Sequence, residues 1–359
     1  MAKVAILGTV GVPAKYGGFE TLAENLVLQN ARASRPQDLV VYCSAKAYFE
    51  RIPDFEGAHL RYIPLQANGK QSIFYDMWSL LDAIFRGTDI VILLGHGGSF
   101  LIPLLRLLTR TKFITNIDGI EWQREKWSGL ARWILRKSEA LAVQYSHVVV
   151  ADNEAIRIYV ADEYGKGCNV IPYGGDHGVA VYPDLDAVAN LPEAYTLALC
   201  RIEPENNVAM ILEAFVELDR PLVFVGNWDN SKYGHDLKLR YKGHPKITIH
   251  DPVYEPNKLR AIRDRATLYV HGHSAGGTNP SLVEMMHFAI PIIAHGCSFN
   301  RHTTEEKALY FMTKEELVNV VRNISEKDAT MIGTKMGEIA RRRYTWDRVG
   351  KSYFELLKK

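Results

Sequence analysis

The chain has 359 residues, of which 47% are hydrophobic, and a formal net charge of +2 at neutral pH. This length predicts about two domains, and the near-neutral charge excludes a uniformly basic nucleic-acid-binding protein. The four cysteines are far apart and form no C-x-x-C pair, which is typical of a reducing, cytoplasmic compartment and excludes a dense disulfide framework.

The first half of the chain alternates short apolar runs with segments of helical period. The predicted strands are 3–7, 39–43, 60–64, 89–94, 112–116, 147–151 and 169–173. Between the first two, apolar residues at helical spacing predict a helix with one buried stripe, formed by Phe19, Leu22, Ala23, Leu26 and Val27. The most apolar stretch, 89–108, contains His96, Arg106 and several glycines, so we expect a strand, a loop and a helix rather than a membrane span.

A second series of strands follows a looser stretch, 173–195. Its predicted strands are 196–200, 221–226, 246–250, 267–272 and 290–295. Strands that are apolar on both faces and separated by helices predict parallel sheets covered on both sides. We therefore expect an α/β protein with two Rossmann-like domains, 1–175 and 176–343. The last helix, 344–359, could pack on either domain, and we predict that it packs on the N-terminal one.

A turn rich in glycine and proline joins the first strand to the first helix. A helix start that follows such a turn favours an anion, usually phosphate, although a turn without any ligand is an equal alternative. The glycines Gly8, Gly11, Gly17 and Gly18 do not have the G-x-G-x-x-G spacing, and no acidic residue ends the second strand. Both absences argue against an NAD-dependent oxidoreductase.

The second domain repeats this arrangement in "HGHSAGGTNPSLVEMM", residues 271–286. Asn279 suits the cap and Pro280 the first turn of a helix. Glu284 lies about one turn further on, where a carboxylate can accept two hydrogen bonds from a ribose diol. The alternative is a capped helix with a solvated glutamate.

Arg201 ends a predicted strand in "LCRIEPENN", residues 199–207. An arginine at the carboxyl end of a parallel strand is well placed to bind a diphosphate with its fork of donors. The alternative is a surface arginine paired with Glu203 or Glu205.

Together with "KYGGFETLAENL" (15–26) and "NIDGIEWQREKW" (116–127), these blocks resemble retaining glycosyltransferases of the GT-B fold, family four. They are most similar to a subgroup of bacterial rhamnosyltransferases that build surface polysaccharides. The resemblance covers nearly the whole chain. It implies two Rossmann-like domains whose parallel sheets face each other across a cleft, the first binding the acceptor and the second the nucleotide-sugar donor.

The resemblance also implies roles for matched positions on the donor side. Arg201 would hold the diphosphate, Glu284 the ribose, and the loop at Val253 the base. The remaining implied donor-binding residues are Gly17, Gly18, Asn206, Gly276, Gly277, Thr278 and Asn279. The chain departs from the family at two of these, because Asn206 stands where the family has Lys and Gly276 where its E-x7-E motif has the first Glu. The lost carboxylate puts common hexose donors in doubt and is compatible with a 6-deoxy sugar.

On the acceptor side, Asp118 and Glu121 follow the strand 112–116 and are candidates for contacts with sugar hydroxyls or with the incoming nucleophile. For Asp118 the alternative is a cap of the next helix. The other candidate acceptor-binding residues are Lys15, Tyr16, His96 and Trp122. We assign catalytic roles to Asp118, Arg201 and Glu284.

No metal or other cofactor is expected, because Arg201, the backbone of 277–279 and a helix dipole can stabilise the departing nucleoside diphosphate. His271 and His273 share one face of a strand end, but a third ligand is missing nearby, which favours core or donor-pocket histidines over a metal site.

Tryptophans lie among basic residues in the segment 122–137, which is typical of a surface that docks on an anionic membrane. The residues concerned are Trp122, Arg124, Lys126, Trp127, Arg132, Trp133, Arg136 and Lys137. The alternative is a buried tryptophan core with a solvated basic edge.

The sequence thus predicts a cytoplasmic retaining glycosyltransferase that moves L-rhamnose from dTDP-rhamnose to a lipid-linked saccharide, with no nucleic-acid partner. The alternatives are a transferase of another UDP- or GDP-sugar, a nucleotide-sugar 2-epimerase, and a nucleotide-sugar-binding protein without turnover.

Overall fold

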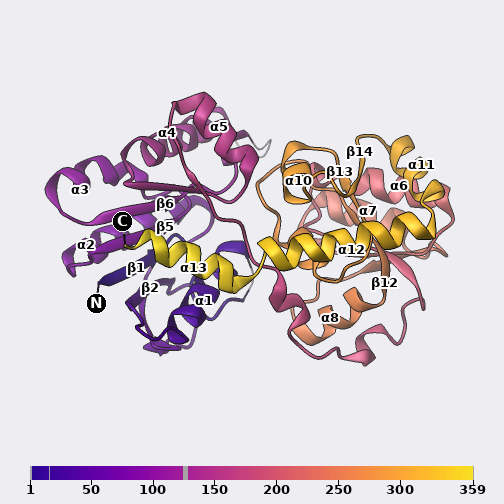
Figure 1. Cartoon of the computed structure of the whole chain (residues 1–359), viewed down its shortest axis with the longest axis horizontal. Helices are drawn as coiled ribbons and strands as arrows, with labels where there is room; N and C mark the ends of the chain where they lie inside the picture. Colours follow the sequence, from indigo (N-terminus) through magenta and orange to yellow (C-terminus); the bar gives the residue numbers. More distant parts are fainter. Residues whose placement is uncertain (1, 16, 124–127, 359) are drawn as a thin grey trace. The chain divides into compact units, whose positions relative to one another are not determined.

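A computed structural model describes residues 2–15, 17–123 and 128–358, and it divides the chain into two compact units (Figure 1). The first unit comprises Met1–Pro172 and Trp346–Lys359, and the second comprises Tyr173–Thr345. No helix of the described residues is both long enough and apolar enough to cross a membrane.

The first unit is built on a sheet with the strand order β3-β4-β2-β1-β5-β6-β7-β8. All its neighbouring strands pair in parallel except the β3–β4 hairpin. The strands are β1 (Lys3–Leu7), β2 (Asp38–Ser44), β3 (Asp54–Phe55), β4 (Ala58–Ile63), β5 (Ile90–Leu94), β6 (Lys112–Asn116), β7 (Val148–Ala151) and β8 (Asn169–Val170). The unit's helices are α1 (Gly18–Ala31), α2 (Ser72–Phe85), α3 (Ile102–Leu108), α4 (Gly129–Tyr145), α5 (Glu154–Tyr164) and α13 (Trp346–Leu356).

The second unit has a parallel sheet with the order β11-β10-β9-β12-β13-β14. Its strands are β9 (Tyr195–Leu199), β10 (Leu222–Val225), β11 (Ile247–His250), β12 (Ala266–His271), β13 (Ile292–His295) and β14 (Leu309–Phe311). Its helices are α6 (Val208–Leu218), α7 (Lys232–Tyr241), α8 (Pro256–Asp264), α9 (Pro280–Met286), α10 (Ser298–Thr303), α11 (Lys314–Asn323) and α12 (Glu326–Arg343).

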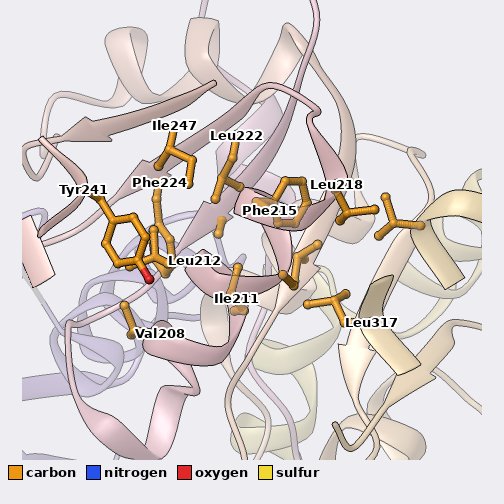
Figure 2. Packing of buried hydrophobic residues seen from close by; sticks show 14 of the residues in the cluster. Val208, Ile211, Leu212, Phe215, Leu218, Leu222, Phe224, Tyr241, Ile247 and Leu317 are labelled. Carbon is orange, nitrogen blue, oxygen red and sulfur yellow. The ribbon is translucent and has the colours of Figure 1, made fainter. Parts of the chain in front are cut away.

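Buried apolar side chains join helices to both sheets. In the first unit the predicted stripe on α1 is buried, except that Phe19 is half-buried. In the second unit α6 places Val208, Ile211, Leu212 and Phe215 at helical spacing against the sheet (Figure 2). The predicted strands all form, although 169–173 is shortened to β8. The sequence missed β3 and β14, which are too short to show a period.

The last helix, α13, packs on the first unit, beside α1 (Figure 1). Tyr353 is fully buried there, and its hydroxyl accepts a hydrogen bond of 2.8 Å from Asn116 Nδ2 at the end of β6. A Cβ on Gly350 would lie 2.8 Å from Gln29 Cγ, so the two helices approach closely. The chain therefore returns to its first sheet after completing the second.

Gly8 is required where β1 ends. Its φ is +80°, and a Cβ there would lie 1.9 Å from the carbonyl oxygen of Leu94 on the neighbouring strand β5. No rotation of a side chain relieves this clash, because the opposing atom belongs to the backbone. The first glycine of the turn is thus fixed by the approach of two strands.

We predict that Gly8→Ala destabilises the first unit by at least ~3 kcal/mol, since strain at positive φ adds to the backbone clash. Gly87→Ala is the matched control, because Gly87 has φ +71° but open space around its Cβ position. The control should lose only about 1–2 kcal/mol. Urea unfolding followed by fluorescence measures the free energy of unfolding of both variants. Equal losses in the two variants would show that the contact with Leu94 is unimportant.

Candidate functional site

The two central strands of the second sheet mark where its strand order reverses. The first strand of this unit, β9, lies between the second strand, β10, and the fourth, β12. In open parallel sheets, ligands bind beyond the carboxyl ends of the strands at such a point. The loops that follow β9 and β12 are therefore the candidate site of the second unit.

Hydrogen bonds hold these two loops together. Asn207 Nδ2 donates to the carbonyl oxygen of Gly272 at 2.8 Å. The backbone N–H and the hydroxyl of Ser274 both donate to the carbonyl oxygen of Glu205, at 3.1 and 2.7 Å. Asn300, in α10 after β13, donates through Nδ2 to the carbonyl oxygen of His273 at 2.8 Å. The loops after three neighbouring strands thus form one hydrogen-bonded network.

The helix α9 begins at this network. Asn279 caps it, with Oδ1 accepting from the backbone N–H and the hydroxyl of Ser281 at 3.1 and 2.8 Å, and Pro280 occupies the first turn. Both predicted helix-start residues are confirmed. Gly276, just before the cap, has φ +113° and open space where a Cβ would be. This backbone conformation favours glycine, which explains why the position carries no side chain.

Glu284 is held by two basic side chains from other segments. Its Oε2 accepts a hydrogen bond from Arg263 Nη2 of α8, and its Oε1 lies 3.3 Å from His177 Nε2 in the turn Asp176–Val179. The Glu284 side chain is only 13% exposed, and that of Arg263 is 4% exposed. Although burial opposes ionisation, Arg263 and His177 lower the pKa of Glu284 to about 2. The carboxylate is therefore ionised throughout the physiological range.

Arg201 is the exposed cation of the network. Its side chain is 45% exposed, and its Nη1 lies 3.8 Å from Glu203 Oε1. Asn206 Nδ2 donates to the carbonyl oxygen of Arg201 at 2.7 Å. A loose, exposed ion pair of this kind contributes little to stability, so the guanidinium can exchange Glu203 for an anionic ligand at small cost.

Two histidines lie beneath the loops at the end of β12. The rings of His271 and His273 stack with centroids 4.4 Å apart, so they do share one face. His271 is fully buried, and burial next to other histidines holds its pKa well below the usual range. In the described ranges, no group of three or more His, Cys, Asp or Glu side chains is arranged to hold a metal ion.

The glycine turn of the first unit is filled by its own carboxyl groups. Glu20 Oε1 accepts from the backbone N–H of Val10 at 2.8 Å, and Glu24 Oε2 accepts from the backbone N–H of Ala14. A Cβ on Gly17 would lie 1.9 Å from Glu20 Oε2. Burial raises the pKa of Glu20. Two backbone donors that could have bound a phosphate therefore bind side chains of α1 instead.

Polar residues also gather beyond the carboxyl end of β6 in the first unit. Asp118 has φ +60°, and its backbone N–H donates to Asn116 Oδ1 at 2.9 Å. Trp122, in the turn Glu121–Gln123, donates its indole N–H to Tyr159 Oη at 3.2 Å. Tyr159 and Tyr164 both donate to Oε1 of the buried Glu139, at 2.7 Å each. The turn that holds Glu121 is thus anchored to α4 and α5.

Comparisons with known proteins agree with this division of the chain. Residues 186–343 match the family model of glycosyl transferases group 1, and residues 1–176 match a domain of unknown function, DUF1972. The second unit is therefore similar in sequence to glycosyl transferases group 1. No curated protein matches the chain.

Three solved structures are similar to the chain over its whole length. Sucrose-phosphate synthase from Thermosynechococcus elongatus is 16% identical with a TM-score of 0.82, covering 100% of this chain and 98% of that chain. HepE from Anabaena, solved with UDP-glucose, is 14% identical with a TM-score of 0.74, covering 100% of both chains. A putative UDP-N-acetylglucosamine 2-epimerase from Listeria monocytogenes is 12% identical with a TM-score of 0.66, covering 99% of this chain and 95% of that chain. The fold is therefore α/β and GT-B.

In the second unit the predicted donor residues Arg201, Asn206 and 276–284 lie in the loops after β9 and β12 and in α9. Glu284 is not solvated, since Arg263 and His177 hold it. Asn206 is only 2% exposed and hydrogen-bonds to the Arg201 backbone, so it positions the loop rather than presenting its amide to a donor. Val253 lies in the loop after β11, which β10 separates from β9. Arg263 and His177 were not predicted as partners of Glu284, because both are distant from it along the chain.

In the first unit the structure corrects the prediction for His96 and shows the surroundings of other predicted acceptor-side residues. His96 is 5% exposed, and burial lowers its pKa, so it lies in the interior rather than on a binding surface. Asp118 adopts a left-handed conformation. Lys15 Nζ donates to the carbonyl oxygen of Ala47 at 3.0 Å. The predicted residue Tyr16 lies outside the described residues. A role in phosphate binding is not supported for Gly17 and Gly18, because Glu20 and Glu24 already accept hydrogen bonds from backbone N–H groups of this turn.

The predicted membrane segment 122–137 is only partly described, because Arg124, Lys126 and Trp127 lie outside the described residues. Trp122 is anchored to Tyr159, and the Arg136 guanidinium lies 5.1 Å from the Trp122 ring centroid and 2.6 Å from Glu163. Of the tryptophans that the structure describes in this segment, only Trp133 is exposed. Trp122 and Arg136 therefore make internal contacts, whereas Arg132, Trp133 and Lys137 are exposed.

We predict that Glu284 links the stability of the second unit to pH. Its pKa in the folded state, about 2, is below its ordinary value of 4.5. Its contribution is therefore present above pH 4.5 and lost as the pH falls towards 2, and it amounts to about 3 kcal/mol at neutral pH. Urea unfolding should show that Glu284→Gln has a lower free energy of unfolding than wild type at pH 7. Between pH 5 and 2 the free energy of unfolding should fall less in this variant than in wild type.

The control for this experiment is Glu213→Gln, which removes an exposed pair with Arg240. It should change stability by less than about 1 kcal/mol. If Glu284→Gln is as stable as this control at neutral pH, the buried pair with Arg263 does not stabilise the domain. Because Glu284→Ala leaves a buried guanidinium without its carboxylate, loss of activity in that variant alone would not identify a ligand contact.

Proposed function

We propose that the protein is a retaining glycosyltransferase that moves a sugar from a nucleotide-sugar donor to a lipid-linked saccharide acceptor. The observation that carries this proposal is the glycosyltransferase group 1 domain, in which the exposed Arg201 and the glycine-rich start of α9 occur at the reversal of strand order. These are the groups that a diphosphate requires, namely a bidentate cation and backbone N–H groups at a helix start.

The proposed chemistry is the departure of a nucleoside diphosphate from the anomeric carbon while an acceptor hydroxyl approaches. Arg201 and the backbone N–H groups of residues 277–279 would stabilise the negative charge that develops on the leaving group. Glu284, ionised at neutral pH, would accept hydrogen bonds from the ribose through the edge that remains exposed. We propose that no metal takes part, since the arginine and the backbone donors supply the electrostatic stabilisation.

The proposed donor is dTDP-L-rhamnose. The support is the missing carboxylate at position 276, where φ +113° favours glycine. Without that acceptor the site offers one partner fewer for sugar hydroxyls, which suits a deoxy sugar better than a hexose with its full set. UDP- and GDP-sugars are the alternatives that a ligand panel must test.

The proposed acceptor domain is the first unit, with Asp118 near the reacting hydroxyl. Its left-handed backbone and its half-buried position beyond β6 present a carboxyl group at the carboxyl edge of the sheet. A carboxylate there would orient the acceptor hydroxyl by hydrogen bonding. Glu121 is a second candidate contact in the anchored turn. The proposed location of the protein is the cytoplasm.

We predict that Arg201→Ala weakens binding of the matching nucleoside diphosphate at least roughly tenfold, because a charge-assisted hydrogen bond is lost. Titration calorimetry with dTDP, UDP and GDP measures both the preference for the base and the effect of the variant. Arg240→Ala, which removes another exposed arginine of the same domain, is the control and should bind as wild type does. Equal affinities of the two variants would place the diphosphate elsewhere.

We predict that Asp118→Asn lowers kcat by about 100-fold or more and leaves nucleotide affinity unchanged, because it removes the carboxylate and tolerates the left-handed backbone. Turnover is followed by release of the nucleoside diphosphate with and without a saccharide acceptor. Asp162→Asn, on the exposed face of α5, is the control. Conversion of the donor to an isomer without acceptor would instead support the 2-epimerase alternative, and unchanged kcat in Asp118→Asn would exclude the proposed role.

A further inference from the structure

Helix α2 carries large apolar side chains on its solvent face. Phe74, Trp78, Leu81 and Phe85 follow the spacing i, i+4, i+7, i+11 and are all exposed, Phe85 to 87%. The opposite side of the helix is also apolar and belongs to the core of the first unit, through residues that include Tyr75. An amphipathic surface helix normally turns polar residues to solvent, so this exposed apolar row indicates a surface that contacts something else.

Helix α3 extends this surface. Its residues Leu104, Leu107 and Leu108 are exposed, Leu107 to 83%. The turn Ser99–Leu101, which leads directly into α3, packs against α2, and buried residues of both helices share one core cluster. The α2–α3 face is defined here as Phe74, Trp78, Leu81, Phe85, Leu104, Leu107 and Leu108. Part of it is hollowed by a groove of about 380 Å³ lined by Trp78, Leu81, Asp82 and Phe85.

The charges around the α2–α3 face are predominantly positive. Residues 99–112 contain Arg106, Arg110 and Lys112 and no acidic residue. The first turns of α4, residues 129–137, also lack acidic residues, and they expose Arg132 and Lys137. The element contacts place α4 against α3. An apolar surface bordered by cations is complementary to an anionic, amphipathic partner.

The nearby acidic residues do not cancel this charge. Asp76 is buried on α2, and Asp82 accepts hydrogen bonds from Arg86 at 2.8 Å and from Tyr42 at 2.8 Å. Asp89, before β5, accepts from the backbone N–H of Lys3 at 2.8 Å. The cations that border the face, which are Arg106, Arg110, Arg132 and Lys137, thus outnumber the acids Asp82 and Asp89.

We propose that the α2–α3 face binds the surface of an anionic lipid bilayer. Its aromatic and leucine side chains would enter the boundary between headgroups and acyl chains, and the bordering arginines would contact lipid phosphates. A second copy of the chain fits less well, because a twofold contact would bring the same arginines together. The proposal does not rest on the proposed function, and it extends the predicted membrane contact from the segment 122–137 to α2 and α3.

The test is co-sedimentation of the full chain with vesicles of phosphatidylglycerol and phosphatidylcholine, compared with phosphatidylcholine alone. We expect binding to the anionic vesicles that weakens with salt. F85S/L107S should lower the partition coefficient at least roughly tenfold, since two exposed apolar side chains lose their lipid contact. R110E/R132E should lower binding to anionic vesicles by a similar factor and leave binding to neutral vesicles unchanged.

The matched control is L239S/M331S, which changes two exposed apolar side chains of the second unit and should bind as wild type does. All variants alter exposed residues, so unchanged circular dichroism and thermal midpoints verify their folds. The proposal is overturned if wild type does not sediment with anionic vesicles, or if F85S/L107S binds as the control does. It is also overturned if F85S/L107S abolishes self-association, measured by light scattering, but does not change binding to vesicles. No donor or acceptor is present, so failure here leaves the proposed transferase activity untouched.

Discussion

The buried guanidinium of Arg263 is the constraint on which the candidate donor site depends. An arginine that is almost fully buried requires a carboxylate, and Glu284 is the partner that α9 supplies. This pairing fixes α9 against α8 and against the turn that holds His177. At the same time it keeps Glu284 ionised, so one residue both stabilises the domain and presents a negative edge near the start of α9.

The loops above this pair are fixed by side chains that bind backbone carbonyl groups. Asn206, Asn207, Ser274 and Asn300 each donate to a carbonyl oxygen of a neighbouring loop residue. Without such side chains, the carbonyl oxygens of loops beyond parallel strands would accept hydrogen bonds from water. With these residues committed to the backbone, Arg201 is the member of the network left exposed, and this supports its proposed contact with a diphosphate.

The two units use similar turns in different ways. Both lead from a strand through glycines into a helix, but Glu20 and Glu24 already bind backbone N–H groups of the turn in the first unit. In the second unit Asn279 caps the helix, and Gly276 leaves the adjoining backbone without a side chain. A glycine-rich turn is therefore not sufficient to predict an anion site, because its own helix can supply the anion. The difference supports donor binding in the second unit.

The sequence by itself determined the alternation of strands and helices, the two parallel sheets, and the cap at Asn279 and Pro280, because these depend on local periodicity and on residues close along the chain. It also identified Arg201 and Glu284 as residues beyond strand ends. Only the tertiary structure decided that Glu284 pairs with Arg263, that Asn206 and His96 are buried, and that α13 returns to the first unit. Those outcomes depend on which surfaces meet when distant segments pack, and burial and ion pairing across such contacts leave no periodic signal in a single sequence.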